Sequence, residues 1–76
     1  MEIIYSKSSL KFLKKQNEET QKRIVAAIEK IPAGDIKRLQ GTGIFRLRVG
    51  DFRVLYDDNG NVVAIIDIGC RGQIYK

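Results

Sequence analysis

The sequence predicts an α+β fold in which two helices near the N-terminus pack on one face of an antiparallel sheet. Two observations carry this prediction. Apolar residues in the first half of the chain recur at the spacing of an α-helix, whereas those in the second half alternate with polar residues, as in strands. The chain has 76 residues, and a chain of this length forms one small core. Residues 1–76 are therefore expected to form a single domain.

The first half of the chain is expected to contain one strand and two helices. Residues 2–5 are mostly apolar and predict a short strand. A helix follows to about Gln16, and its candidate N-cap residues are Ser6, Ser8 and Ser9. Asn17 is expected to cap a second helix, whose apolar stripe comprises Ile24, Val25, Ala27, Ile28 and Ile31. Pro32 and Gly34 are expected to end this second helix.

The second half is expected to consist of strands. Residues 45–49 and 52–56 alternate around Gly50-Asp51, which predicts a hairpin with a type II′ turn because glycine comes first in the loop. Asn59-Gly60 predicts a second turn, followed by a largely buried strand over residues 62–68. A short last strand is expected over residues 73–75. The predicted order is therefore β-α-α-β-β-β, with this further strand at the C-terminal end.

Composition excludes several classes of function. The chain has no histidine, and Cys70 is its only cysteine. A His/Cys metal site, a histidine-dependent catalytic unit and an internal disulfide therefore cannot form, and we expect no metal and no cofactor. No apolar run approaches the ~20 residues of a membrane span, and the N-terminus lacks the features of a signal peptide. A cytoplasmic protein with no membrane partner is therefore expected.

The charge of the chain favours an acidic partner. It has 14 Lys+Arg against 9 Asp+Glu, a formal net charge of +5. Such an excess suits binding to nucleic acid, to a membrane surface or to an acidic protein, and it also serves solubility alone. The distribution is more informative than the sum, because five cations lie between Lys37 and Arg53 with one acid, Asp51, among them.

The register of the predicted hairpin places an arginine cluster on one face of the sheet. With Gly50-Asp51 as the loop, the apolar residues of both strands fall on one face, and Arg46, Arg48 and Arg53 fall on the other. Arg48 then lies directly opposite Arg53, and like charges in such a pair are destabilising. An anion between the guanidinium groups explains the arrangement, since their planar fork fits phosphate oxygens. The alternative is a solvated face on which the long side chains splay apart.

Three stretches of the chain also carry a recognisable pattern. They are Leu39-Gln40-Gly41, the run IFRLRVGDFRVLY over residues 44–56, and the run IGCRGQIYK over residues 68–76. Together with the β-α-α-β-β-β order, they resemble the RelE/ParE superfamily, the toxins of type II toxin–antitoxin pairs, and specifically its RelE-like branch. The resemblance covers essentially the whole chain and implies a small twisted antiparallel sheet. It also implies metal-independent cleavage of mRNA in the ribosomal A site, in which the ribose 2′-OH attacks the neighbouring phosphate and translation is inhibited.

The resemblance further implies roles for individual residues. The RNA- and phosphate-binding residues that it indicates are Arg46, Arg48, Lys37 and Arg38, and the catalytic residues are Arg53, Arg71 and Tyr75. In these relatives the arginine matched by Arg53 stabilises the phosphate, and the one matched by Arg71 acts as an acid or a charge stabiliser. The tyrosine matched by Tyr75 is a proposed general base in some members. The chain departs from many relatives at Cys70, where they carry histidine, and in the short spacing from Arg71 to Tyr75.

Two other functions remain open at this stage. A ParE-like toxin would share the fold and would inhibit DNA gyrase by binding it, although Arg71 and Tyr75 favour the RelE-like branch. A catalytically inactive binding module is the other alternative, because the family histidine is replaced by Cys70. All three imply a cognate antitoxin encoded beside this chain, with operator DNA bound through their complex, and the first also implies the ribosome and mRNA as partners.

Overall fold

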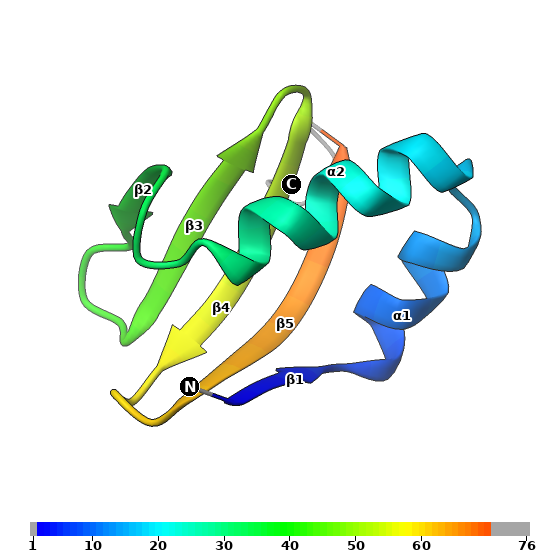
Figure 1. The fold of residues 1–76 in the computed structure, drawn as a ribbon. Helices are drawn as coiled ribbons and strands as arrows, with labels where there is room; N and C mark the ends of the chain where they lie inside the picture. Colours follow the sequence, from blue (N-terminus) through cyan, green and yellow to red (C-terminus); the bar gives the residue numbers. More distant parts are fainter. Residues whose placement is uncertain (1, 71–76) are drawn as a thin grey trace.

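The computed structural model describes residues 2–70 and places two helices on one side of a five-stranded sheet (Figure 1). The elements are β1 (Glu2–Tyr5), α1 (Lys7–Lys14), α2 (Glu18–Glu29), β2 (Asp35–Arg38), β3 (Ile44–Val49), β4 (Phe52–Asp58) and β5 (Val62–Cys70). The predicted α+β class, with two helices ahead of the main strands, is confirmed. The strand predicted over residues 73–75 lies outside the described residues. Neither helix within residues 2–70 has the length and apolar character that a membrane-spanning helix needs.

The sheet is mixed rather than wholly antiparallel, which corrects the prediction for its first strand. The strand order is β1-β5-β4-β3-β2. The strand β1 pairs in parallel with β5, whereas all other neighbours are antiparallel. The two helices carry the chain across one face, from β1 at one edge to β2 at the other (Figure 1). A parallel pair requires such a long crossover connection, which the helices supply.

The strand β2 was not predicted from the sequence. Its residues, DIKR, include one partly buried apolar side chain, Ile36, and Asp and Lys are depleted in strands. The strand forms because it pairs with β3, from Asp35 opposite Arg48 to Arg38 opposite Phe45. It is the first of the four described strands that follow the helices, and it precedes the predicted hairpin.

The predicted hairpin register is confirmed. Arg48 lies opposite Arg53 and Leu47 opposite Val54. Gly50 has φ +59°, and no other residue of the loop has a positive φ, as a type II′ turn requires. A Cβ at position 50 would also clash with the Arg23 guanidinium of α2. Glycine is thus required here by the turn, whereas the flexible end of the Arg23 side chain can move aside.

Both predicted helix caps are confirmed. The Ser6 Oγ accepts a hydrogen bond from the Ser9 N–H at 3.1 Å, and the Asn17 Oδ1 accepts one from the Thr20 N–H at 2.8 Å. These bonds satisfy donors that a helix leaves free at its N-terminus. The Ser6 hydroxyl also donates to the Ile66 carbonyl of β5 at 2.7 Å, which ties the start of α1 to the sheet.

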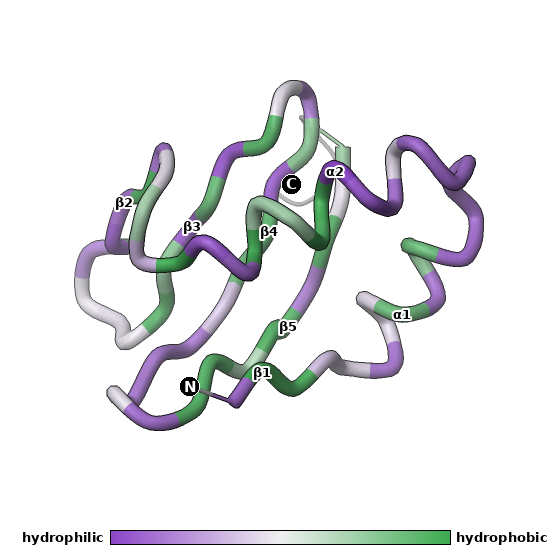
Figure 2. Tube along the Cα trace, in the orientation of Figure 1, coloured by the Kyte–Doolittle hydropathy of each residue, from purple (hydrophilic) through white to green (hydrophobic). Residues whose placement is uncertain are grey.

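The core lies between the two helices and the sheet. Its buried side chains come from both helices, the α2–β2 connection and three strands: Leu13, Ile24, Ile28, Ile31, Leu47, Val49, Val54, Tyr56, Val63, Ile65 and Ile68. Figure 2 shows hydrophobic and hydrophilic residues alternating along β3. Because successive strand residues point to opposite faces, the polar residues between these core positions lie on the face away from the helices.

Candidate nucleic-acid interface

The face of the sheet opposite the helices carries the predicted arginine cluster, Arg46, Arg48 and Arg53. Arg46 and Arg48 are two residues apart on β3, and Arg48 lies directly opposite Arg53 on β4. Residues directly opposite in antiparallel strands share a face, with Cβ atoms about 5 Å apart. Gly69 of β5 pairs with Arg53 on its other side. The register thus places three arginines on neighbouring positions of this face, two of them close to the turn between β3 and β4.

Arg46 is largely buried and forms an ion pair with Asp35. Its side chain is 15% exposed, and its Nη2 lies 3.5 Å from the Asp35 Oδ1. Its Nε is buried and has no hydrogen-bond partner among residues 2–70. Lys37 and Leu55 flank it on the neighbouring strands. A guanidinium in this setting is held close to the sheet, whereas Arg48 is exposed.

Lys37 joins this face, but Arg38 does not. Lys37 is exposed and lies opposite Arg46. Arg38 lies opposite Phe45, whose partner Tyr56 belongs to the core face. Its guanidinium carbon is 6.0 Å from the centroid of the Phe45 ring, and its Nε donates to the Thr42 carbonyl at 3.4 Å. The structure therefore separates Arg38 from the arginine cluster, because adjacent strand residues point to opposite faces.

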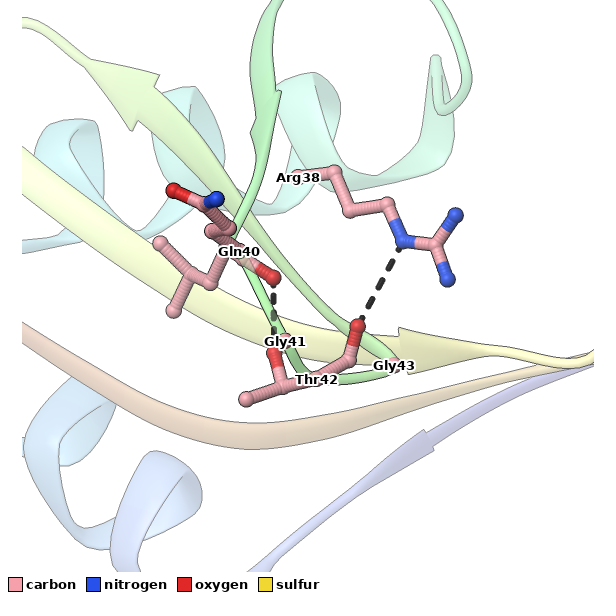
Figure 3. Close-up of a pocket in the computed structure, with 6 residues that line it drawn as sticks. Arg38, Gln40, Gly41, Thr42 and Gly43 are labelled. Atoms are coloured by element: carbon pink, nitrogen blue, oxygen red, sulfur yellow. Dashed lines mark hydrogen bonds between the residues drawn. The ribbon is translucent and has the colours of Figure 1, made fainter.

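An open hollow of about 560 Å³ lies over the connection between β2 and β3. It is lined by residues 38–43, and none of the clustered arginines reaches it. Figure 3 shows the Arg38 Nε directed at Thr42 and the other guanidinium nitrogens pointing away from the loop. The Thr42 hydroxyl donates to the Leu39 carbonyl at 3.0 Å, which closes the loop on itself. The hollow is a feature of loop shape and is separate from the cluster.

Two predicted catalytic residues, Arg71 and Tyr75, lie outside the described residues. The described tyrosines, Tyr5 and Tyr56, belong to the helix side of the sheet. Burial, and to a lesser extent the charge of Asp58, raises the pKa of Tyr56. Burial, and to a lesser extent Glu29, raises the pKa of Tyr5. Both shifts disfavour the phenolate, so neither side chain is suited to act as a base.

Asp35 is a residue of this face that the sequence analysis did not predict. It lies opposite Arg48 and contacts Arg46, so one carboxylate stands beside two of the clustered arginines. Its place depends on the pairing of β2 with β3, and β2 has no clear strand signal in its four residues. Two features together could have indicated its role. Asp35 is an acid beside a basic stretch, and it lies close enough in sequence to the hairpin for its segment to pair with β3.

The arrangement can bind an anion and stabilise negative charge. Arginine keeps its proton under all ordinary conditions and presents donors in a fork that matches phosphate oxygens. Donors fixed in advance around a phosphate can also stabilise the charge that develops on it during a reaction. Phosphate groups of a nucleic acid are therefore a ligand that fits this face.

Comparison with known proteins identifies the family. The family model described as the ParE toxin of type II toxin–antitoxin systems, parDE, matches residues 3–75. A search of curated proteins found no match. Among solved structures, the chain is similar to one in the RelB–RelE antitoxin–toxin complex from Methanococcus jannaschii, with 28% identity and a TM-score of 0.77. That match covers 95% of this chain and 94% of the other.

Two further structures support the same fold. A chain of the archaeal RelE–RelB complex from Pyrococcus horikoshii OT3 is 26% identical, with a TM-score of 0.74 over 95% of this chain and 96% of that one. The YoeB dimer from Staphylococcus aureus is 21% identical, with a TM-score of 0.72 over 93% and 94% of the two chains, and shows likeness of fold alone. The family match spans nearly the whole sequence. It confirms the RelE/ParE superfamily that the sequence resembles. This chain belongs to the ParE toxin family of the RelE/ParE superfamily and is a toxin of the type II toxin–antitoxin class.

Proposed function

We propose that this toxin is a metal-independent endoribonuclease that cleaves mRNA in the ribosomal A site and thereby inhibits translation. The observation that carries the proposal is the cluster of Arg46, Arg48 and Arg53 on the face opposite the helices. The direct pairing of Arg48 with Arg53 costs stability, and a bound phosphate between them offsets that cost. The similarity to RelE structures, at 28% and 26% identity, supports RNA rather than another polyanion as the ligand.

In the proposed reaction, the ribose 2′-oxygen forms a bond to the adjacent phosphorus, and the bond from phosphorus to the 5′-oxygen of the next nucleotide breaks. The products are a 2′,3′-cyclic phosphate and a 5′-hydroxyl. Tyr75 takes the proton of the 2′-OH, and water returns a proton to the 5′-oxygen. Arg53 and Arg71 stabilise the charge on the phosphate, since arginine cannot act as a base. Arg46, Arg48 and Lys37 bind the flanking backbone.

The proposed partners are a cognate antitoxin, the ribosome with its mRNA, and operator DNA through the antitoxin complex. A groove of about 340 Å³ between α2 and β3 supports an antitoxin segment as one of them. Ala26, Ala27 and Leu47 line its apolar part, and Arg23 and Lys30 add positive charge. Such a groove suits an amphipathic acidic segment that folds as it binds.

The test is primer extension on a defined mRNA in a purified translation system, with and without ribosomes. Wild-type protein is compared with Arg53→Ala and Arg71→Ala, and Lys22→Ala serves as the control. Lys22 is a cation on α2 with a 76% exposed side chain, so its loss lowers the net charge equally without touching the cluster. We expect ribosome-dependent cuts that persist in Lys22→Ala and fall at least 100-fold in the two arginine variants, within the range for loss of a charge-stabilising donor.

A second candidate function is inhibition of DNA gyrase, and the matching family model, that of a ParE toxin, favours it. A supercoiling assay with stoichiometric toxin separates the two functions. Inhibition of supercoiling without any RNA cleavage would replace the endoribonuclease proposal. An absence of both activities, with normal growth during strong expression of folded protein, would identify a binding module.

A further inference from the structure

Asp35 contacts the arginine cluster to which the proposed function assigns the RNA phosphates. Its carboxylate lies 3.5 Å from the Arg46 Nη2, and its backbone lies opposite that of Arg48. It is the first residue of β2, an edge strand of the sheet. One carboxylate is therefore positioned against the same guanidinium groups that would receive the RNA backbone.

The contact between Asp35 and Arg46 is weak. Its length exceeds the 2.7–2.9 Å typical of a hydrogen bond between charged groups. The Asp35 side chain is 60% exposed, and ion pairs open to water contribute little to stability. A dianionic or monoanionic phosphate that reaches Arg46 can therefore displace the carboxylate at small cost.

Burial is expected to hold Arg46 in position when Asp35 is removed. Its side chain is 15% exposed, and its Nε is buried, so packing against the sheet holds the guanidinium from the other side. Removing the Asp35 charge then leaves the cation without the ion pair that it makes among residues 2–70. Asp35 lowers the positive potential of the cluster more than it organises the cluster.

We propose that Asp35 is a built-in counterion that competes with the RNA backbone for Arg46 and so sets the affinity of the interface. This inference rests on the proposed function, since it assumes that phosphates bind the cluster. Binding in the wild type must release Asp35, and the variant Asp35→Asn gains one cation that a phosphate can neutralise. For single strands, each such cation steepens the slope of log K against log salt by about 0.7.

The experiment measures binding of a labelled, single-stranded 2′-O-methyl RNA, which cannot be cleaved through its 2′ position, by fluorescence anisotropy from 50 to 300 mM KCl. Asp35→Asn is compared with the wild type and with Asp51→Asn. Asp51 is exposed in the turn between β3 and β4, and its substitution changes the net charge by the same amount. We expect Asp35→Asn to bind about 5- to 10-fold more tightly at 50 mM KCl, with a slope steeper by about 0.7, and Asp51→Asn to keep the wild-type slope.

A second probe separates this inference from the proposed function. Pyrophosphate should raise the thermal unfolding midpoint of Asp35→Asn more than that of Asp51→Asn, whether or not RNA binds. If RNA fails to bind any variant but this difference persists, the competition with free RNA is wrong and the counterion role toward phosphate stands, whereas failure of the proposed function would show as an absence of cuts in the primer-extension assay with ribosomes. If Asp35→Asn behaves like Asp51→Asn with both probes, or binds RNA more weakly than the wild type, the counterion role is wrong.

Discussion

At the scale of single residues, the fold changes the acidity of the Tyr56 hydroxyl by burying it. The side chain is 2% exposed, and its ring stacks on that of Phe45 with centroids 5.4 Å apart. Burial raises the pKa of its hydroxyl, and the charge of Asp58 adds to the shift. The folded protein therefore holds Tyr56 neutral at pH values where the unfolded chain ionises it.

This shift predicts how stability depends on alkaline pH. A tyrosine with a raised pKa binds its proton more tightly when folded, so the stability that it contributes is complete below its ordinary pKa of about 10 and is lost as the pH rises above that value. Tyr56→Phe keeps the ring and removes the ionisation. We expect its free energy of unfolding, measured in urea from pH 8 to 11.5, to fall less above pH 10 than that of the wild type. Parallel curves for the two proteins would contradict the assigned shift.

At the scale of elements, the two helix caps differ in how far their effects extend. The Asn17 side chain satisfies one backbone donor of α2. Ser6 satisfies one donor of α1 and also donates to the Ile66 carbonyl of β5. The first cap is local, whereas the second joins the start of a helix to a strand 60 residues away in the sequence.

Removing the two caps should therefore have unequal costs. Asn17→Ala is expected to lower the free energy of unfolding by about 1 kcal/mol, the usual effect of losing an N-cap. Ser6→Ala is expected to cost about 2 kcal/mol, because the hydrogen bond to β5 is lost as well. Urea unfolding followed by circular dichroism measures both. Equal losses would show that the Ser6 bond adds nothing to stability beyond the bond that Ser8 donates to the same Ile66 carbonyl.

At the scale of the whole molecule, one small core supports a sheet whose other face carries the arginine cluster. Every buried apolar side chain among the described residues belongs to a single cluster. A domain of this length has a stability of roughly 4–11 kcal/mol at about 0.05–0.15 kcal/mol per residue. The loss of one core contact is therefore felt across the molecule.

Truncation in this core should remove a large part of the total stability. Ile28 of α2 is 0% exposed, so Ile28→Ala is expected to cost about 2–5 kcal/mol. Leu10 of α1 is 45% exposed, and Leu10→Ala, a deletion of similar size, should cost less than about 1 kcal/mol. Urea unfolding of the two variants makes the comparison. A comparable loss for Leu10→Ala would mean that its exposed side chain contributes to the core.

Part of this molecule was predictable because the relevant physics is local. A serine or asparagine ahead of a helical stretch caps it, glycine first in a two-residue loop selects a type II′ turn, and strict alternation decides which face a side chain occupies. Ser6, Asn17 and Gly50 follow these rules, and so does the pairing of Arg48 with Arg53. The arginine cluster was therefore deduced from residues close together in the chain.

The sequence by itself thus determined the helices, the hairpin, its register and the charged face that the hairpin presents. Only the tertiary structure decided that β1 pairs in parallel with β5, that β2 forms at all, and hence that Asp35 reaches Arg46 while Arg38 turns to Phe45. These features depend on which distant strands become neighbours and in what register. A polar four-residue strand carries too little hydrophobic pattern to specify either, so the rest of the sheet specifies both.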